Sequence, residues 1–200
     1  MKISLIRHGR PTARQSSRIS AATFAAWLRE YDEAGIDATL PPPDRLTRSL
    51  ATCSLVVTSP LRRAIESADR LGLAAERRVT IEAREVELPN RLKWPFPHRP
   101  ATFVGLARFL WLLRLARAQE DIQQVGVRAR LLALELSALA QDHGHVALVG
   151  HGYLNLFLRQ QLEAAGWRSS DPRARGYWSC AHFEKTRPAK HSAAPFAARS

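Results

Sequence analysis

The chain has 200 residues, of which 46% are hydrophobic and 24% are charged, and its formal net charge is +12 at pH 7. This length favours one domain with a substantial core, and the excess of positive charge favours an anionic partner: a phosphorylated metabolite, nucleic acid or an acidic membrane. No compact basic stretch interleaved with aromatic residues resembles a nucleic-acid recognition module, so a specific nucleic-acid partner is disfavoured.

The sequence is typical of a cytoplasmic protein. Cys53 and Cys180 lie far apart without metal-ligand spacing, which favours two reduced thiols, although the sequence alone leaves a disulfide open. Arg7 interrupts the first apolar run too early for a signal peptide. The apolar stretch at 101–118 is too short, and too often interrupted by arginine, for a transmembrane segment. The pattern carries no indication of an oligomeric state.

Strands and helices alternate in the first part of the chain. The predicted elements are a strand at 3–6, helices at 21–33 and 45–51, a strand at 54–58, and a helix from 60 to about 71. Ser20 is the expected N-cap of the first helix, and Ser59 and Pro60 are the expected N-cap and first residue of the third. Arg7 and His8 therefore lie at the carboxyl end of a strand, where open α/β sheets bind ligands.

The alternation continues to the end of the chain. The predicted elements are a short strand at 79–81, helices at 101–118 and 121–141, a strand at 145–149, a helix carrying Leu154 to Leu162, and a strand at 177–183. This order predicts an α/β layered fold with a largely parallel sheet. We expect a single domain over 1–184, with a loop and helix at 86–118 as a cap and a basic, disordered tail at 185–200.

Three predicted strand ends carry residues suited to an anion. Arg7 and His8 follow the first strand, Arg63 lies just inside the next helix, and His151 lies between two glycines at a helix start, where amide groups stabilise anions. These groups describe a pocket for a phosphoryl group. The sequence has no glycine-rich phosphate loop and no carboxylate cluster for Mg²⁺. We therefore expect neither a metal nor a cofactor, with the protein's own cations neutralising the transferring group.

Four segments together resemble the histidine phosphatase superfamily, also called phosphoglycerate mutase-like. They are LIRHG at 5–9, TSPLRRAIESA at 58–68, RE at 84–85 and VGHG at 149–152, in the order that the family has them. The resemblance implies a three-layer sandwich with a largely parallel central sheet flanked by helices. The family's pattern places its pocket arginine directly before alanine, which implies Arg63, while Arg62 points about 100° away around the helix.

The resemblance also implies roles for these residues. His8 is the expected nucleophile, Arg7, Arg63 and His151 the expected phosphate ligands, and His151 and Glu85 further catalytic groups. Glu85 is the favoured acid because it directly precedes a loop able to reach the pocket, and Glu82 and Glu87 are the alternatives. The residues after the histidine motif, Arg10 and Pro11, depart from the Glu or Gln and Thr that many members have.

The expected activity is metal-independent hydrolysis of a small phosphate monoester through a phosphohistidine. A phosphomutase is an alternative, disfavoured because the long insertion of a glycolytic mutase is not apparent. A catalytically weak protein that binds a phospho-ligand is the other alternative.

Substrate specificity is expected to come from 89–115. Its aromatic residues indicate a sizeable or partly apolar leaving group, although core packing explains them equally well. They are Trp94, Phe96, His98 and Trp111. The apolar helix in this segment is interpreted as a buried cap, with membrane-surface contact or an apolar wall for a substrate as the alternative.

Overall fold

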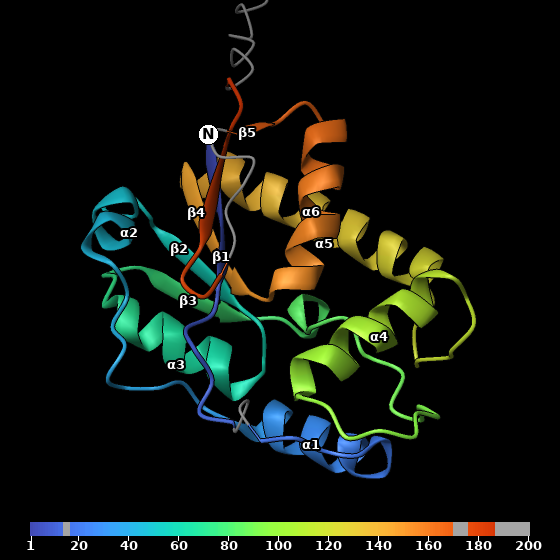
Figure 1. Cartoon of the computed structure of the whole chain (residues 1–200). Helices are drawn as coiled ribbons and strands as arrows, with labels where there is room; N and C mark the ends of the chain where they lie inside the picture. Colours follow the sequence, from blue (N-terminus) through green and yellow to red (C-terminus); the bar gives the residue numbers. More distant parts are fainter. Residues whose placement is uncertain (14–16, 170–175, 187–200) are drawn as a thin grey trace, which may run out of the picture.

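A six-stranded mixed sheet forms the centre of the protein in the computed structural model, which describes residues 1–13, 17–169 and 176–186 (Figure 1). The strands are β1 (Lys2–Arg7), β2 (Leu55–Thr58), β3 (Glu76–Val79), β4 (His145–Gly150), β5 (Arg168–Ser169) and β6 (Cys180–Glu184). Their order is β3-β2-β4-β1-β6-β5. The first four in this order are parallel, and β6 and β5 add antiparallel pairs at one side. The predicted α/β fold with a largely parallel sheet is confirmed.

Helices cover both faces of the sheet (Figure 1). They are α1 (Ala21–Glu33), α2 (Asp44–Ser49), α3 (Arg62–Leu71), α4 (Pro100–Leu112), α5 (Ile122–His143) and α6 (Gly152–Ala164), with a 3-10 turn, η1 (Ile81–Ala83). One face packs against α5 and α6, and the other against α2 and α3. The result is the expected three-layer arrangement, because each face of the sheet is apolar and must be buried.

The side chains of β1 show how the two cores are built. Ile3 and Leu5 pack with α5 and α6, whereas Ile6 packs on the opposite face, as the two-residue period of a strand requires. The neighbouring strand β4 is buried at all of its positions because it lies between β1 and β2 and is covered on both faces. This burial explains why its sequence is apolar without alternation.

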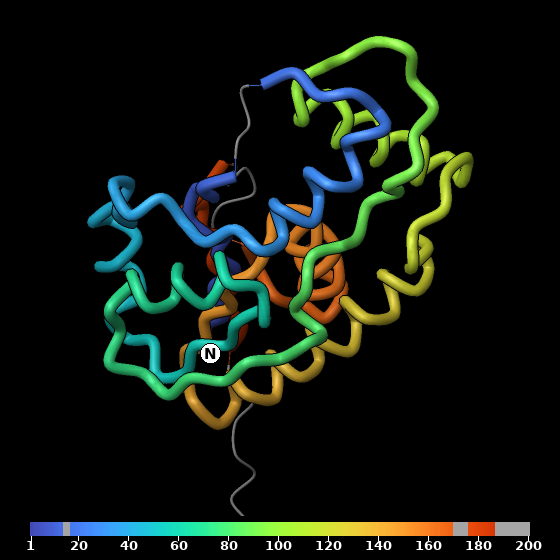
Figure 2. The backbone as a smooth tube through the Cα atoms, turned by 90° about the horizontal axis from the view of Figure 1, so that it is seen from below, coloured from blue at the N-terminus to red at the C-terminus, as the bar shows by residue number. Residues whose placement is uncertain are grey.

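The helices α1 and α4 form a cap at the end of the sheet opposite the N-terminus (Figures 1 and 2). Phe24 and Trp27 of α1 pack with Phe103 of α4 and with Leu92 of the preceding loop in a separate apolar cluster. The rings of Phe24 and Phe103 are 5.4 Å apart. The segment 86–118 therefore covers this end of the sheet together with α1, whose predicted bounds and Ser20 cap are confirmed.

The start of α3 differs from the prediction. The helix begins at Arg62 with Leu61 at its N-cap position, so Ser59 and Pro60 lie outside it. The Ser59 hydroxyl oxygen does accept a hydrogen bond from the Leu61 amide at 3.3 Å. The serine nevertheless continues β2 toward the sheet edge, where its amide donates to the Val149 carbonyl at 3.2 Å. Ser59 is therefore held by pairing with β4 and is not the N-cap of α3.

Two other predicted elements are also wrong in their bounds. The strand expected at 79–81 is β3, which ends at Val79, and Ile81 begins the 3-10 turn. The four residues of β3 are all exposed at the edge of the sheet, so the sequence has no apolar pattern that indicates this strand. The helix expected to reach residue 118 ends at Leu112, and the chain turns at Arg114, which has a φ of 59°.

The last strand is shifted from its predicted position. The strand expected at 177–183 is β6, which runs from Cys180 to Glu184, and residues 187–200 of the expected tail lie outside the described residues. Among the helices of the described residues, none is long and apolar enough to cross a membrane.

Candidate active site

The carboxyl edge of three neighbouring parallel strands gathers the predicted site residues. β4 lies between β1 and β2, and Arg7 is in register with Gly150. The pairing continues past the strand end, because the His8 amide donates to the Gly150 carbonyl at 3.0 Å. His8 and His151 consequently lie side by side, with ring centroids 5.1 Å apart at an interplanar angle of 61°. The structure therefore brings the ends of β1 and β4 together.

The ring of His8 is held in one tautomer. Its Nδ1 lies 2.7 Å from the carbonyl oxygen of Gly9, which can only accept, so Nδ1 carries the proton and Nε2 does not. The side chain is 2% exposed. Burial, and then the nearby His151 and Arg63, hold the pKa of His8 well below its usual value. At neutral pH its Nε2 is therefore an unprotonated nitrogen with nucleophilic character.

The turn after His8 requires glycine because another residue packs against it. A β-carbon at Gly9 would lie 2.6 Å from the Trp178 ring. The Gly9 amide donates to the Ser67 hydroxyl at 2.9 Å, and that hydroxyl donates to the Arg63 carbonyl at 2.5 Å. Ser67 thus ties the histidine turn to the helix that carries Arg63.

His151 is also fixed by a buried partner. Its Nε2 lies 2.8 Å from the Ser59 hydroxyl oxygen, while its Nδ1 is buried without a hydrogen-bond partner. The residue has no exposed surface, and burial, followed by the charges of Arg63 and Arg7, lowers the pKa of His151 well below its usual value. Both imidazoles are therefore neutral at neutral pH, and the positive charge of the site comes from its arginines.

Arg63 points into the site and Arg62 points away, as predicted. Arg63 is 1% exposed, whereas the Arg62 side chain is 69% exposed and pairs with Glu66 at 2.6 Å. The Arg63 guanidinium donates to the Tyr31 and Asp32 carbonyls at 3.0 and 3.3 Å and to the Asp32 carboxylate at 3.2 Å. Its Nε stays buried and unpartnered.

Arg7 lies beside the start of α6. A β-carbon at Gly152 would lie 3.2 Å from the Arg7 side chain, so this glycine gives the guanidinium room. The Arg7 Nε is buried and has no hydrogen-bond partner, and its guanidinium carbon lies 4.5 Å from the centre of the Tyr177 ring. Four buried side-chain atoms in the described residues lack a partner, and three of them belong to Arg7, Arg63 and His151.

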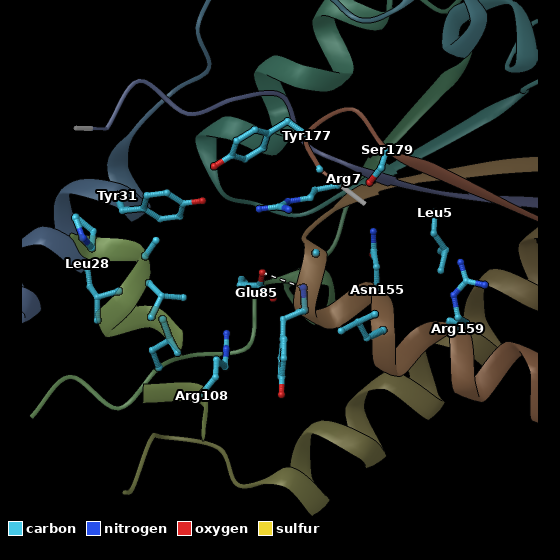
Figure 3. A pocket seen from close by; sticks show the side chains of 18 of the residues that line it. Leu5, Arg7, Leu28, Tyr31, Glu85, Arg108, Asn155, Arg159, Tyr177 and Ser179 are labelled. Carbon is cyan, nitrogen blue, oxygen red and sulfur yellow. Dashed lines mark hydrogen bonds between the residues drawn. The ribbon is translucent and has the colours of Figure 1, made fainter. Parts of the chain in front are cut away.

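Glu85 faces a cavity of about 610 Å³ that Arg7 also lines (Figure 3). Its carboxylate accepts hydrogen bonds from the amides of Val86 at 2.9 Å, Leu154 at 3.0 Å and Tyr153 at 3.3 Å. The last two amides belong to the first turn of α6, where a carboxylate is stabilised. Among the described residues that line this cavity, Glu85 is the one carboxylate of the three predicted candidates.

Two arginines, one of them buried and the other partly buried, hold the backbone on both sides of Glu85. Arg128 of α5 donates to the carbonyls of Glu82 at 2.7 Å and Arg84 at 3.0 Å. Arg108 of α4 donates to the Glu87 carbonyl at 2.9 Å and to the Val86 carbonyl. These hydrogen bonds fix the position of the backbone that carries Glu85.

Two tyrosines cover the site and were not predicted from the sequence. The Tyr177 ring lies 5.8 Å from the His8 ring, and the Tyr31 ring lies 4.7 Å from the Arg63 guanidinium carbon. Both tyrosines line the cavity, whereas His8, Arg63 and His151 are not among the residues that line it. The roles of Ser59 and Ser67 in the site were also not predicted. Both serines lie within the 58–68 motif, and this location could have identified them as site residues.

Comparison with known proteins identifies the fold. No family model matches the sequence, and no curated protein is significantly similar to it in sequence. A mycobacterial glucosyl-3-phosphoglycerate phosphatase is 23% identical over 80% of this chain and 78% of its own, with a TM-score of 0.53. Entamoeba histolytica phosphoserine phosphatase in complex with 3-phosphoglyceric acid is 14% identical over 92% and 97%, with a TM-score of 0.59. A putative alpha-ribazole-5'-P phosphatase from Escherichia coli is 18% identical over 81% and 79%, with a TM-score of 0.54. The chain shares the fold of these phosphatases, in agreement with the fold expected from its resemblance to the histidine phosphatase superfamily.

Proposed function

We propose that the chain is a metal-independent phosphatase that hydrolyses a phosphate monoester through a phosphohistidine on His8. In the first step Nε2 of His8 forms a bond to phosphorus while the bond to the leaving oxygen breaks, and Glu85 protonates that oxygen. In the second step Glu85 takes a proton from water, whose oxygen displaces His8 and releases inorganic phosphate.

The unpartnered nitrogens of Arg7, Arg63 and His151 carry this proposal. Leaving a buried donor unsatisfied costs about 1–3 kcal/mol, so three at one sheet edge favour an anion that binds all of them. A phosphoryl group offers several strong acceptor oxygens. The two guanidiniums keep their charge while both imidazoles are neutral, so they neutralise the transferring group.

The solved structures of similar fold support a phosphatase over a mutase, since those named above are phosphatases by name. The substrate would be a small phosphorylated molecule, taken up through the cavity beside Arg7 and Glu85. We further propose a cytoplasmic location, which the low cysteine content of the sequence supports, because disulfide-rich chains are typical of oxidising compartments.

Hydrolysis of p-nitrophenyl phosphate in the presence of EDTA tests the proposal. We expect turnover by the wild-type chain, loss of turnover in His8→Ala, and rapid formation of an acid-labile phosphoenzyme with radiolabelled substrate. Turnover that survives His8→Ala, or that EDTA abolishes, would overturn the proposal. Interconversion of phosphoglycerates without phosphate release would identify a mutase, and tight ester binding without a phosphoenzyme would identify a binding protein.

A further inference from the structure

The cavity beside Arg7 and Glu85 has an apolar wall. This wall comes from β1, α1, the loop before α4, α4 itself and α6. Its large apolar members are Leu5, Trp27, Leu28, Leu88, Val104 and Leu156. The volume of about 610 Å³ is within the range of sites that enclose a whole organic group. The wall therefore favours burial of apolar surface next to the proposed phosphate site.

The cations that line this cavity are already engaged. The Arg108 guanidinium donates to two backbone carbonyls and lies 4.1 Å from the centre of the Tyr153 ring. Arg159 donates to the Ser169 hydroxyl at 3.0 Å and lies 3.6 Å from the Glu163 carboxylate. Arg7 belongs to the phosphate site, and none of the described lining residues is a lysine. A second anionic group on a substrate would therefore lose its hydration and would have to displace these contacts in order to pair with Arg108 or Arg159.

One polar atom near the wall has no partner among the described residues. It is the side-chain oxygen of Asn155, on α6, which is buried without a hydrogen bond, and Asn155 is one of the residues that line the cavity. Figure 3 shows Asn155 on the far side of Glu85 from Tyr31. An uncharged hydroxyl or amide N–H of a ligand would satisfy this acceptor, whereas a carboxylate would not.

We propose that the cavity selects phosphate monoesters of uncharged, largely apolar alcohols and discriminates against leaving groups that carry a carboxylate. The proposal rests on the function proposed above and names its substrate class. The apolar wall binds the carbon skeleton, Asn155 accepts one hydrogen bond from it, and Arg7 marks the boundary with the phosphate.

Binding of non-hydrolysable phosphonates tests this selectivity without requiring catalysis. Calorimetry on the wild-type chain would compare methyl-, butyl- and hexylphosphonate with 6-phosphonohexanoate. We expect affinity to rise by roughly three- to fourfold for each added methylene and to fall by at least about tenfold on adding the terminal carboxylate. Affinity that does not depend on chain length, or a carboxylate ligand that binds as tightly as hexylphosphonate, would overturn the proposal.

A pair of variants at Val104 sharpens the test. Val104→Lys adds a cation to the wall, and Val104→Met adds similar length without charge. We expect the lysine variant to bind 6-phosphonohexanoate more tightly than the methionine variant does. Methylphosphonate, which has neither a chain nor a carboxylate, is the control ligand for this comparison of the two variants. Equal affinities of the two variants for the carboxylate ligand would count against the assignment of the wall.

A turnover experiment separates this proposal from the proposed function. Hexyl phosphate and its ω-carboxylate analogue have chemically similar leaving oxygens, so their kcat/KM ratio reports the cavity. Turnover with preference for the carboxylate ester overturns the selectivity and leaves the phosphatase standing. The predicted phosphonate affinities without turnover of either ester overturn the phosphatase and leave the binding selectivity standing.

Discussion

The Nε2 atom of His151 and the hydroxyl oxygen of Ser59 form a buried 2.8 Å hydrogen bond between the ends of β4 and β2. The same hydroxyl oxygen accepts from the Leu61 amide, which leaves its hydrogen available to His151. With Ser59 as donor, the imidazole proton lies on Nδ1, the nitrogen that has no partner within the described chain. A neutral His151 then presents an N–H group to an anion.

Replacement of Ser59 tests this positioning role. Ser59→Ala leaves Nε2 of His151 buried and unsatisfied, so we expect unfolding free energy to fall by about 1–3 kcal/mol and kcat/KM for p-nitrophenyl phosphate to fall about tenfold. Ser59→Thr keeps the hydroxyl and should retain most activity. Urea denaturation and steady-state kinetics measure the two effects. Full kcat/KM in Ser59→Ala would show that the hydrogen bond does not position His151.

Glu85→Gln distinguishes a proton donor from a helix cap. The amide keeps one oxygen, which can accept from the Val86 and Leu154 amides as Oε1 of Glu85 does, but it does not titrate. For an alkyl phosphate, whose leaving oxygen needs a proton, we expect the rate to fall by about 100-fold or more. The phosphorylation rate with p-nitrophenyl phosphate should fall less, because that leaving group departs without protonation.

The other two glutamates serve as matched controls for this prediction. Glu82→Gln and Glu87→Gln should each change the rate with the alkyl phosphate by less than about threefold, since neither residue lines the cavity that holds Glu85. A large loss in either control, or an equal loss for both leaving groups in Glu85→Gln, would assign the acid elsewhere.

Arg62 and Arg63 form a natural matched pair on adjacent positions of one helix. Arg63→Lys removes the planar guanidinium from a buried position, and we expect kcat/KM to fall by about 100-fold. Arg62→Lys alters an exposed side chain and should leave kcat/KM within about twofold. Kinetics with p-nitrophenyl phosphate and calorimetry with vanadate measure both. Similar losses in the two variants would mean that the helix, and not the Arg63 guanidinium, matters for phosphate binding.

The site residues that the sequence predicts are each indicated by the residues next to them in the chain. His8 and His151 each follow a short, mostly apolar run, and such runs predict buried strands whose carboxyl ends bind ligands in open α/β sheets. Arg63 follows from the position of Ala64 in the 58–68 motif. These inferences need neighbouring residues alone, so the gathering of the two histidines and two arginines could be predicted before the strand order was known.

The features that sequence reasoning missed depend on distant contacts. Ser59 and His151 are separated by 92 positions in the chain, and the N-cap preference of serine favoured a different role. Tyr31 and Tyr177 reach the site from α1 and from the segment before β6, and no pattern in either segment indicates it. The edge strand β3 is exposed at every position, so its charged sequence resembles a loop.

A second buried histidine network lies at the other end of β4. Nε2 of His145 is 2.8 Å from the Ser4 hydroxyl oxygen, and its Nδ1 is 2.8 Å from the Thr52 hydroxyl oxygen. The Ser4 oxygen is also 2.8 Å from Nδ1 of His182. Burial, followed by the charge of Lys2, lowers the pKa of His145 to about 4. His145 is therefore neutral in the folded protein down to mildly acidic pH.

This network predicts loss of stability in acid. The unfolded chain protonates His145 near pH 6.5 and the folded chain near pH 4. The contribution of His145 is therefore complete above pH 6.5 and is lost as the pH falls toward 4, by up to about 3 kcal/mol of unfolding free energy. His145→Gln keeps a polar group toward Ser4 but cannot titrate, so its unfolding free energy should fall less steeply with acid than that of wild type. Urea denaturation of both proteins between pH 7 and pH 4 measures the difference, and parallel curves would exclude His145 as its source.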